Sequence, residues 1–209
     1  LKILQDTDFV PPQLKPERLR TVEASWQLHG AENAFMLAAY HNRYQQFIAE
    51  QPTPDYADEY HYNQPGEWIT RGLDAEYLHR FGDWNLRVTA AWLDIEESDV
   101  EREYPLAEWT GAMLLDGPLH NAHRVAVRVL YQSARADYND VTFADDEADA
   151  FLQLGLAVTG PLTERIRYAA GIDNATDTLI FDAPGDFEST RYNHMRAGRQ
   201  VWLRLTADF

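Results

Sequence analysis

The sequence predicts an all-β fold in which antiparallel strands follow one another up and down, as in a transmembrane β-barrel. Three observations lead to this prediction. About nine segments alternate apolar and polar side chains with a period of two, the pattern of a half-buried strand. Short and long connections alternate between these segments. The last segment, 199–209, ends with the aromatic residue Phe209 on its apolar face, which suits a strand that faces lipid.

The composition fits such a fold and argues against several other classes of protein. The 209 residues are 45% hydrophobic and 12% aromatic, and their formal net charge is −16. This negative charge argues against nucleic-acid binding, which needs a basic surface. Because the chain has no cysteine, disulfide scaffolds, thiolate zinc sites and cysteine nucleophiles are excluded. No apolar run approaches the roughly 20 residues that a membrane-spanning helix needs.

The first four predicted strands follow a proline-rich opening. The first ends at about His29, and it places valine, alanine, tryptophan and leucine at alternate positions. The next three are expected at 34–49, 68–80 and 84–92. Alternation is weakest in 34–49, where Asn42-Arg43 interrupts the apolar positions.

Five further strands are predicted, and they indicate which face meets lipid. Their expected ranges are 104–115, 123–132, 151–158, 165–172 and 199–209. We expect an outward, lipid-side orientation for a set of apolar residues on two of these strands: Val125, Val127, Val129, Leu203, Leu205 and Phe209. An arginine that faces lipid at the membrane centre costs roughly 2–4 kcal/mol. The opposite, inward side should therefore hold Arg124, Arg128, Arg165 and Arg167.

The connections predict the orientation of the barrel. The short ones lie near 30–33, 81–83, 116–120 and 159–162, and the long ones near 50–67, 96–103, 134–149 and 173–198. Outer-membrane barrels have short periplasmic turns and long extracellular loops. A periplasmic carboxyl terminus would place all four long connections outside. Because an antiparallel barrel needs an even number of strands, nine indicate the carboxyl-terminal portion of a larger barrel.

Four short motifs resemble TonB-dependent outer-membrane receptors and transporters. They are Leu14-Lys15-Pro16-Glu17, Gly72-Leu73-Asp74-Ala75-Glu76, the segment Gly171 to Asp177, and Gly198-Arg199 with the last strand. The motifs occur in the family's order and cover nearly the whole chain. One departure is Ala175-Thr176, which replaces the family's apolar and aromatic pair. The plug domain, the TonB box and the early barrel strands have no counterpart in 1–209.

This resemblance implies a partial receptor barrel domain over 1–209, from a barrel of about 22 strands with a plugged lumen. It implies a location in the cell outer membrane and uptake of a scarce solute, most simply an iron–siderophore complex or a similar chelate. The implied partners are outer-membrane lipid, the small-molecule chelate, the TonB energy-coupling protein through the missing plug, and the barrel-assembly machinery through the Phe209 strand. Neither a cofactor nor a nucleic-acid partner is expected.

Aromatic and cationic side chains in two long connections are the candidate ligand-binding residues. The first long connection and its border contain Tyr56, Tyr60, His61, Tyr62 and Trp68, and the last contains Arg191, Tyr192 and His194. Aromatic rings can stack on a ligand and cations can pair with its anionic groups. The alternative is that these aromatic side chains pack against one another or anchor at lipid headgroups.

Catalysis and metal binding find little support. Asp74 and Glu76 are two apart on one strand, which alternation alone explains, and the seven histidines lack metal-ligand spacing. We therefore expect no catalytic residue and no metal site. Two other classes remain as alternatives: a small outer-membrane barrel enzyme such as a protease, with His61 and His194 at its rim, and a soluble acidic β-protein that binds an apolar ligand.

Overall fold

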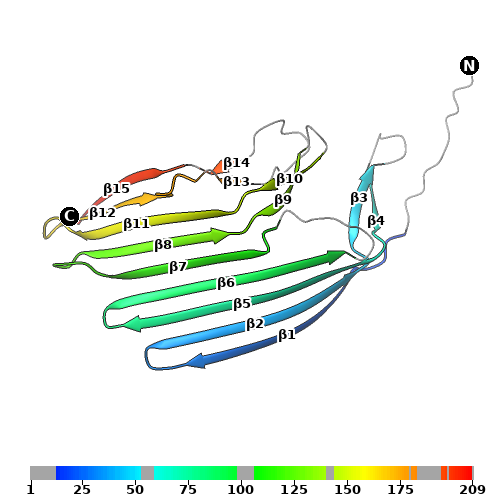
Figure 1. Ribbon diagram of the computed structural model, residues 1–209, viewed down its shortest axis with the longest axis horizontal. Coiled ribbons are helices and arrows are strands. Elements are labelled where there is room, and N and C mark those ends of the chain that lie inside the picture. Colours follow the sequence, from blue (N-terminus) through cyan, green and yellow to red (C-terminus); the bar gives the residue numbers. More distant parts are fainter. Residues whose placement is uncertain are drawn as a thin grey trace, which may run out of the picture. The chain divides into compact units, whose positions relative to one another are not determined.

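The computed structural model describes residues 13–52, 59–97, 106–139, 144–178, 180–182, 194–196 and 198–208. Nine antiparallel strands in these ranges form one sheet in the order β1-β2-β5-β6-β7-β8-β11-β12-β15 (Figure 1). The described part of the chain contains no helix. It accordingly offers no helical segment that is long and apolar enough to span a membrane.

The nine strands are long and run close to their predicted positions. Their bounds are β1 (Arg18–His29), β2 (Asn33–Gln45), β5 (Glu67–Phe81), β6 (Trp84–Glu97), β7 (Trp109–Pro118), β8 (Arg124–Gln132), β11 (Phe151–Pro161), β12 (Ile166–Asp173) and β15 (Gln200–Ala207). The predicted all-β antiparallel fold and the up-and-down strand order are thus confirmed.

Three of the long connections contain hairpins where the sequence predicted only loops. They are β3 (Ile48–Pro52) with β4 (Glu59–Asn63), β9 (Arg135–Asn139) with β10 (Ala144–Ala148), and β13 (Ile180–Asp182) with β14 (His194–Arg196). Three of the predicted strands also have clearly different bounds. The strand expected at 84–92 continues to Glu97. The strand expected at 34–49 ends at Gln45, because Gln46 takes a left-handed φ of 59° and breaks the extended backbone. The strand expected from 104 begins at Trp109.

The chain divides into two compact units, and each is described by itself. The hairpin unit comprises Leu1–Val22, Tyr40–Arg71 and Ile95–Arg102, and the sheet unit comprises Glu23–Ala39, Gly72–Asp94 and Glu103–Phe209. The hairpin unit contains β3 and β4, whereas the sheet unit contains the whole of β7, β8, β11, β12 and β15.

Strand register separates an apolar from a polar face in the sheet unit. Paired residues project from the same face, so the pairs Val127 with Leu156, Leu156 with Ile172, and Ile172 with Val201 define one continuous row. The same pairing places Val125 in line with Leu203. The predicted sharing of one face by the three valines, Leu203 and Leu205 is therefore confirmed.

The predicted arginines lie on the other face wherever a strand holds them. Arg124, Arg128 and Arg167 alternate with the apolar positions in β8 and β12. Arg165 lies in the turn before β12 and is therefore assigned to neither face. Phe209 lies outside the described residues.

Aromatic side chains occupy both ends of the apolar face. At the turn end, Phe81 and Trp84 stack with their ring centroids 6.3 Å apart. At the opposite end, Trp92 contacts Trp109 at 6.3 Å. Trp84 and Trp92 lie eight residues apart on β6, which corresponds to roughly 26 Å of strand at about 3.3 Å per residue. An apolar band of about this height between aromatic girdles is the exterior of an outer-membrane barrel.

Candidate functional site

The side chain of Asn63 holds the hairpin unit together. Its Oδ1 accepts a hydrogen bond from the Lys15 backbone N–H at 2.6 Å, and its Nδ2 donates to the Lys15 carbonyl at 2.9 Å. The same Nδ2 also donates to the Gln46 carbonyl at 2.7 Å. One amide at the end of β4 thus joins the segment before β1 to the bend between β2 and β3.

Glu17 makes a second connection between these segments. Its Oε1 accepts the backbone N–H of Ile48, the first residue of β3, at 2.8 Å. The carboxylate thereby supplies the partner that the first N–H of this strand needs. Together with Lys15, Glu17 gives the Leu14-Lys15-Pro16-Glu17 motif a structural role, in which it anchors the entry to β1 against the hairpin.

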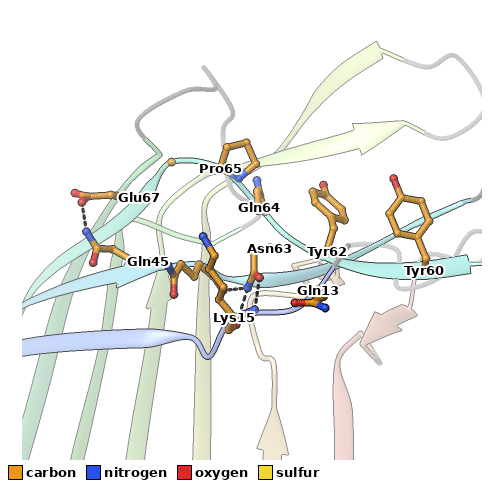
Figure 2. Close-up of a pocket in the computed structure, with 11 residues that line it drawn as sticks. Gln13, Lys15, Gln45, Tyr60, Tyr62, Asn63, Gln64, Pro65 and Glu67 are labelled. Atoms are coloured by element: carbon orange, nitrogen blue, oxygen red, sulfur yellow. Dashed lines mark hydrogen bonds between the residues drawn. The ribbon is translucent and has the colours of Figure 1, made fainter. Parts of the chain in front are cut away.

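The hydrogen bonds of Asn63 to Lys15 and Gln46 border a pocket of about 770 Å³. Its lining residues come from the segment before β1, the end of β2, β4 and the start of β5: Gln13, Lys15, Gln45, Gln46, Tyr60, Tyr62, Asn63, Gln64, Pro65, Gly66 and Glu67. Figure 2 shows Tyr60 and Tyr62 side by side on β4. Their ring centroids lie 6.0 Å apart, and both rings line the pocket.

The pocket holds little net charge. Among the lining side chains, only Lys15 and Glu67 are formally charged. The Glu67 carboxylate already pairs with Arg43 at 3.0 Å, and it also accepts a hydrogen bond from the Gln45 amide. This lining contains many hydrogen-bonding groups but no cluster of like charges that would attract a strongly charged ligand.

The structure brings together only part of the predicted ligand-binding set. Tyr60 and Tyr62 share the pocket, whereas His61 alternates to the opposite face of β4 and lies in register with Glu50. Trp68 stacks on Phe47 with centroids 4.8 Å apart and planes at 14°. Trp68 does not line the pocket, so its described contact is the aromatic packing that the sequence analysis gave as the alternative.

The other predicted residues belong to segments that are described in part or not at all. His194 lies in β14, where its backbone pairs with Asp182. Tyr56, Arg191 and Tyr192 lie outside the described residues. Their roles as ligand-binding residues stay predictions.

Sequence reasoning missed the amide side chains of the pocket. Gln13, Gln45, Gln46, Asn63 and Gln64 are dispersed over some fifty positions, and no spacing joins them before the chain bends. Among the polar lining residues, only Lys15 belongs to a motif that was recognised in the sequence. The chain bends at Gln46, and a pattern of apolar and polar residues does not predict this bend.

The polar face of the sheet unit holds pairs of opposite charge. Glu76 pairs with Arg87 at 2.9 Å, and Asp116 pairs with Arg124 at 2.6 Å. A third acid, Asp173, links three strands. In the described part of the chain, no three histidine, aspartate or glutamate side chains are placed to hold a metal ion.

Asp173 at the end of β12 connects to strands on both sides. Its Oδ1 accepts from Arg128 of β8 at 2.9 Å, and its Oδ2 accepts from the Trp202 indole of β15 at 2.9 Å. The indole covers Gly171, since a Cβ there would lie 2.6 Å from Trp202 Cζ2. This arrangement explains two positions of the motif at 171–177 as packing and hydrogen bonding.

Asn174 completes the same motif. It is 1% exposed with a left-handed φ of 51°, and its side chain donates to the Thr178 carbonyl at 2.8 Å and accepts the Thr178 N–H at 3.1 Å. Thr176 donates from its hydroxyl to the Leu152 carbonyl at 3.0 Å. Thr176, which departs from the pattern of the family that the motif resembles, therefore fastens the loop to β11.

A sheet of long antiparallel strands with one apolar face, aromatic side chains at both ends of that face and charge pairs on the other defines an outer-membrane β-barrel protein. The model of the family "TonB dependent receptor-like, beta-barrel" matches residues 4–175. The chain belongs to this family, and its location is the outer membrane. Members of the family are transporters and receptors, and in general they are not enzymes.

Solved structures of the same fold include several metal and siderophore transporters. The pyoverdine outer membrane receptor FpvA from Pseudomonas aeruginosa PAO1 matches at 13% identity over 94% of this chain and 30% of its own, with a TM-score of 0.75. The FrpB iron transporter from Neisseria meningitidis matches at 12% identity, over 93% of this chain and 32% of its own, with a TM-score of 0.73. The copper transporter OprC matches at 16% identity, over 94% and 32%, with a TM-score of 0.70.

These neighbours share the fold with the chain, which spans about a third of the length of each. No curated protein sequence matches the chain.

Proposed function

We propose that the protein takes part in TonB-dependent uptake of a scarce solute across the outer membrane. The observation that supports this proposal is the match of the family's barrel model to 4–175. In this proposal 1–209 is one partial barrel domain without catalytic activity. Energy arrives from TonB through a plug domain, and the barrel-assembly machinery reads the Phe209 strand. The solute is bound by side chains in the long connections.

An iron–siderophore complex or a similar chelate is the proposed solute. The names of three structural neighbours, a copper transporter, an iron transporter and a pyoverdine receptor, support a metal-related cargo. The proposed contacts are Tyr56, Tyr60, His61, Tyr62, Trp68, Arg191, Tyr192 and His194. Of these, Tyr60 and Tyr62 line a pocket that is large enough for part of a drug-sized ligand.

Uptake by cells tests this proposal directly. The complete receptor is expressed in a strain that lacks its own siderophore receptors, and accumulation of radioactive iron is measured with a panel of ferric siderophores. We expect uptake that requires both the receptor and a functional TonB. A matching strain with the tonB gene deleted is the control. Equal accumulation with and without TonB, for every chelate in the panel, would contradict the proposal.

A further inference from the structure

The net negative charge of the chain lies entirely in its four long connections. The connections at 50–67, 96–103, 134–149 and 173–198 contain 21 of the 34 aspartate and glutamate residues but only 4 of the 18 lysine and arginine residues, which gives them a formal charge of −17. All other positions together contain 13 acidic and 14 basic residues, a formal charge of +1. The strands and the short turns are therefore close to neutral.

The strand order of the sheet brings the long connections to the same end. Strands that follow one another in the sheet are antiparallel neighbours, as in β6 with β7, β7 with β8, β8 with β11 and β11 with β12. Successive connections therefore alternate between the two ends, and the long ones fall at the end opposite the short turns. In outer-membrane barrels the long connections are extracellular, on the side from which a solute arrives.

The described arginines beside these connections do not cancel the excess of acids. Arg43 pairs with Glu67 at 3.0 Å, and Arg71 pairs with Glu96 at 2.6 Å. Each ion pair is close to neutral when seen from a distance. Counting both pairs as neutral lowers the excess in the long connections only from −17 to −15.

A charge of one sign that is gathered at one end acts on every ion that approaches this end. Such a surface creates a potential of several kT, which raises the local concentration of counter-ions and their association rate by roughly 10–10³. The same potential repels ions of the surface's own sign. The effect needs no dedicated contact, and it weakens with salt because the Debye length falls from about 30 Å at 0.01 M to about 3 Å at 1 M.

We propose that the long connections form an electronegative entrance that selects cationic solutes, such as a hydrated metal ion or a positively charged chelate, over anionic ones. The inference rests on the proposed uptake function, because it assigns the charge of the solute. In this proposal no single acid is a binding residue. The summed field of the connections determines which solutes reach the receptor fastest.

Fluorescence quenching of the complete receptor by ions of opposite charge tests the inference. The chain has no cysteine, so a dye is attached either to Ala150→Cys, next to the connection 134–149, or to Ala31→Cys in a short turn; both positions are exposed. Thallium(I), acrylamide and iodide are the cationic, neutral and anionic quenchers, each normalised to the free dye. At about 0.01 M salt we expect thallium(I) to quench the dye at position 150 roughly tenfold more than iodide. The ratio should be near one at position 31, and near one at both positions at about 1 M salt.

Two triple variants remove the same total charge from opposite ends. The first neutralises one long connection with Asp145→Asn, Asp146→Asn and Glu147→Gln, and it should lower the ratio at position 150 about twofold. The matched control neutralises three exposed acids of the short turns, and it should leave this ratio unchanged: Glu32→Gln, Asp83→Asn and Glu164→Gln. Folding of every variant is checked by heat-modifiable migration on gels.

Three results would overturn the inference. They are equal quenching by thallium(I) and iodide at position 150, an equal decrease in both triple variants, and loss of the preference in millimolar magnesium but not in sodium of the same ionic strength. The last result would show that the acids hold divalent cations, which would leave the entrance without its field.

The uptake panel gives a separate measurement on the solute itself. It includes a linear ferric trihydroxamate with a terminal amine and its succinylated form, which share one chelating core and carry opposite charges. We expect the chelates that accumulate to be cationic or neutral, and equally fast accumulation of an anionic chelate would overturn the assignment. Because quenching is measured without transport, a cation preference with no accumulation of any chelate rejects only the transport function.

Discussion

Asn63 is the residue on which the hairpin unit depends most directly. Its side chain makes three hydrogen bonds to backbone groups, at 2.6, 2.9 and 2.7 Å. Asn63→Ala removes all three and returns the exposed backbone groups of Lys15 to water, at a net cost of about 0.5–1.5 kcal/mol for each hydrogen bond lost. We expect faster amide hydrogen exchange at 13–17 in this variant of the complete receptor, with little change in β8 and β11.

Asn85→Ala serves as the comparison for this variant. The Asn85 amide makes one long hydrogen bond, to Asp116 at 3.4 Å, and lies in the sheet unit. Its loss should leave exchange at 13–17 unchanged. Equal exchange in the two variants would show that Asn63 does not anchor this segment.

Gly171 is a second residue whose role follows from its surroundings. A Cβ there would lie 2.6 Å from Trp202 Cζ2 and 2.7 Å from the Leu156 carbonyl oxygen, so the backbone of β11 would have to move. Overpacking of this kind typically costs about 1–3 kcal/mol. We expect Gly171→Ala to lower the temperature at which the folded gel band of the receptor disappears.

Gly111→Ala is the matched control for Gly171→Ala. The Cβ added at Gly111 would meet its nearest atom, the Thr89 carbonyl oxygen, at 3.4 Å. The unfolding temperature of this variant should stay close to that of the parent. A decrease as large as that of Gly171→Ala would mean that loss of glycine in a strand, rather than the clash, determines stability.

Individual site residues were predictable only where they carried a family motif or an aromatic ring. Tyr60 and Tyr62 were found because aromatic side chains in a long connection are conspicuous. The separation of His61 from them follows from strand alternation, which was not expected there because 50–67 was predicted to be a loop. Gln46 gave no signal, since its left-handed backbone cannot be inferred from residue type.

The strands of the main sheet were predictable because apolar and polar side chains alternate along each of them. Alternation of apolar and polar residues predicted the bounds of β8, β11 and β12 to within a few residues at each end. It also placed the valines of β8 on the face opposite its arginines. The short hairpins were missed for a physical reason. A strand of three to five residues has too few alternate positions to form a pattern, and β3 ends at Pro52, which reads as a breaker.

The facing of β8 leads to a prediction about membrane cost. Val127 lies in the middle of the apolar row, paired with Leu115 and Leu156. We expect Val127→Arg to reduce the stability of the receptor in the membrane by about 2–4 kcal/mol, the cost of an arginine that faces lipid near the centre. Urea unfolding in lipid vesicles measures this difference.

Ala126→Arg tests whether the cost belongs to the face or to the strand. Ala126 is the neighbouring residue on the opposite, polar face, between Arg124 and Arg128, whose side chains are both 49% exposed. An arginine added there stays hydrated, so we expect a change below about 1 kcal/mol even though Asp116 already pairs with Arg124. If both arginine variants were equally destabilised, the assignment of the apolar face to lipid would be refuted.

At the scale of the whole molecule, sequence patterns predicted the fold class and the family, and the barrel model of the family confirms both. The solute was beyond reach because the connections that we propose as its binding region follow bends such as the one at Gln46, which no alternation pattern predicts. The division into two compact units was also not predicted. Their boundaries cut through single strands such as β5, where alternation continues without a break.

Assembly of the complete receptor gives the last prediction. The apolar positions of β15 recur at every second residue from Val201 to Leu205, and Phe209 continues this period in the sequence. An exposed apolar strand with free backbone groups can pair with a strand of the assembly machinery. We expect Phe209→Asp to prevent accumulation in the outer membrane without a selective loss of ligand affinity. Cell fractionation tests this, and normal levels of folded, heat-modifiable protein would show that the terminal strand is not an assembly signal.

The two-faced register of β8, β11, β12 and β15 also limits how this sequence can change in evolution. Deleting one residue inside such a strand would exchange the faces of every residue beyond it, and would turn arginines such as Arg128 toward the side of Val127. Deleting two residues would preserve the faces and shift only the pairing. Length variation among descendants should therefore accumulate in the connections at any size, and within the strands only in even steps.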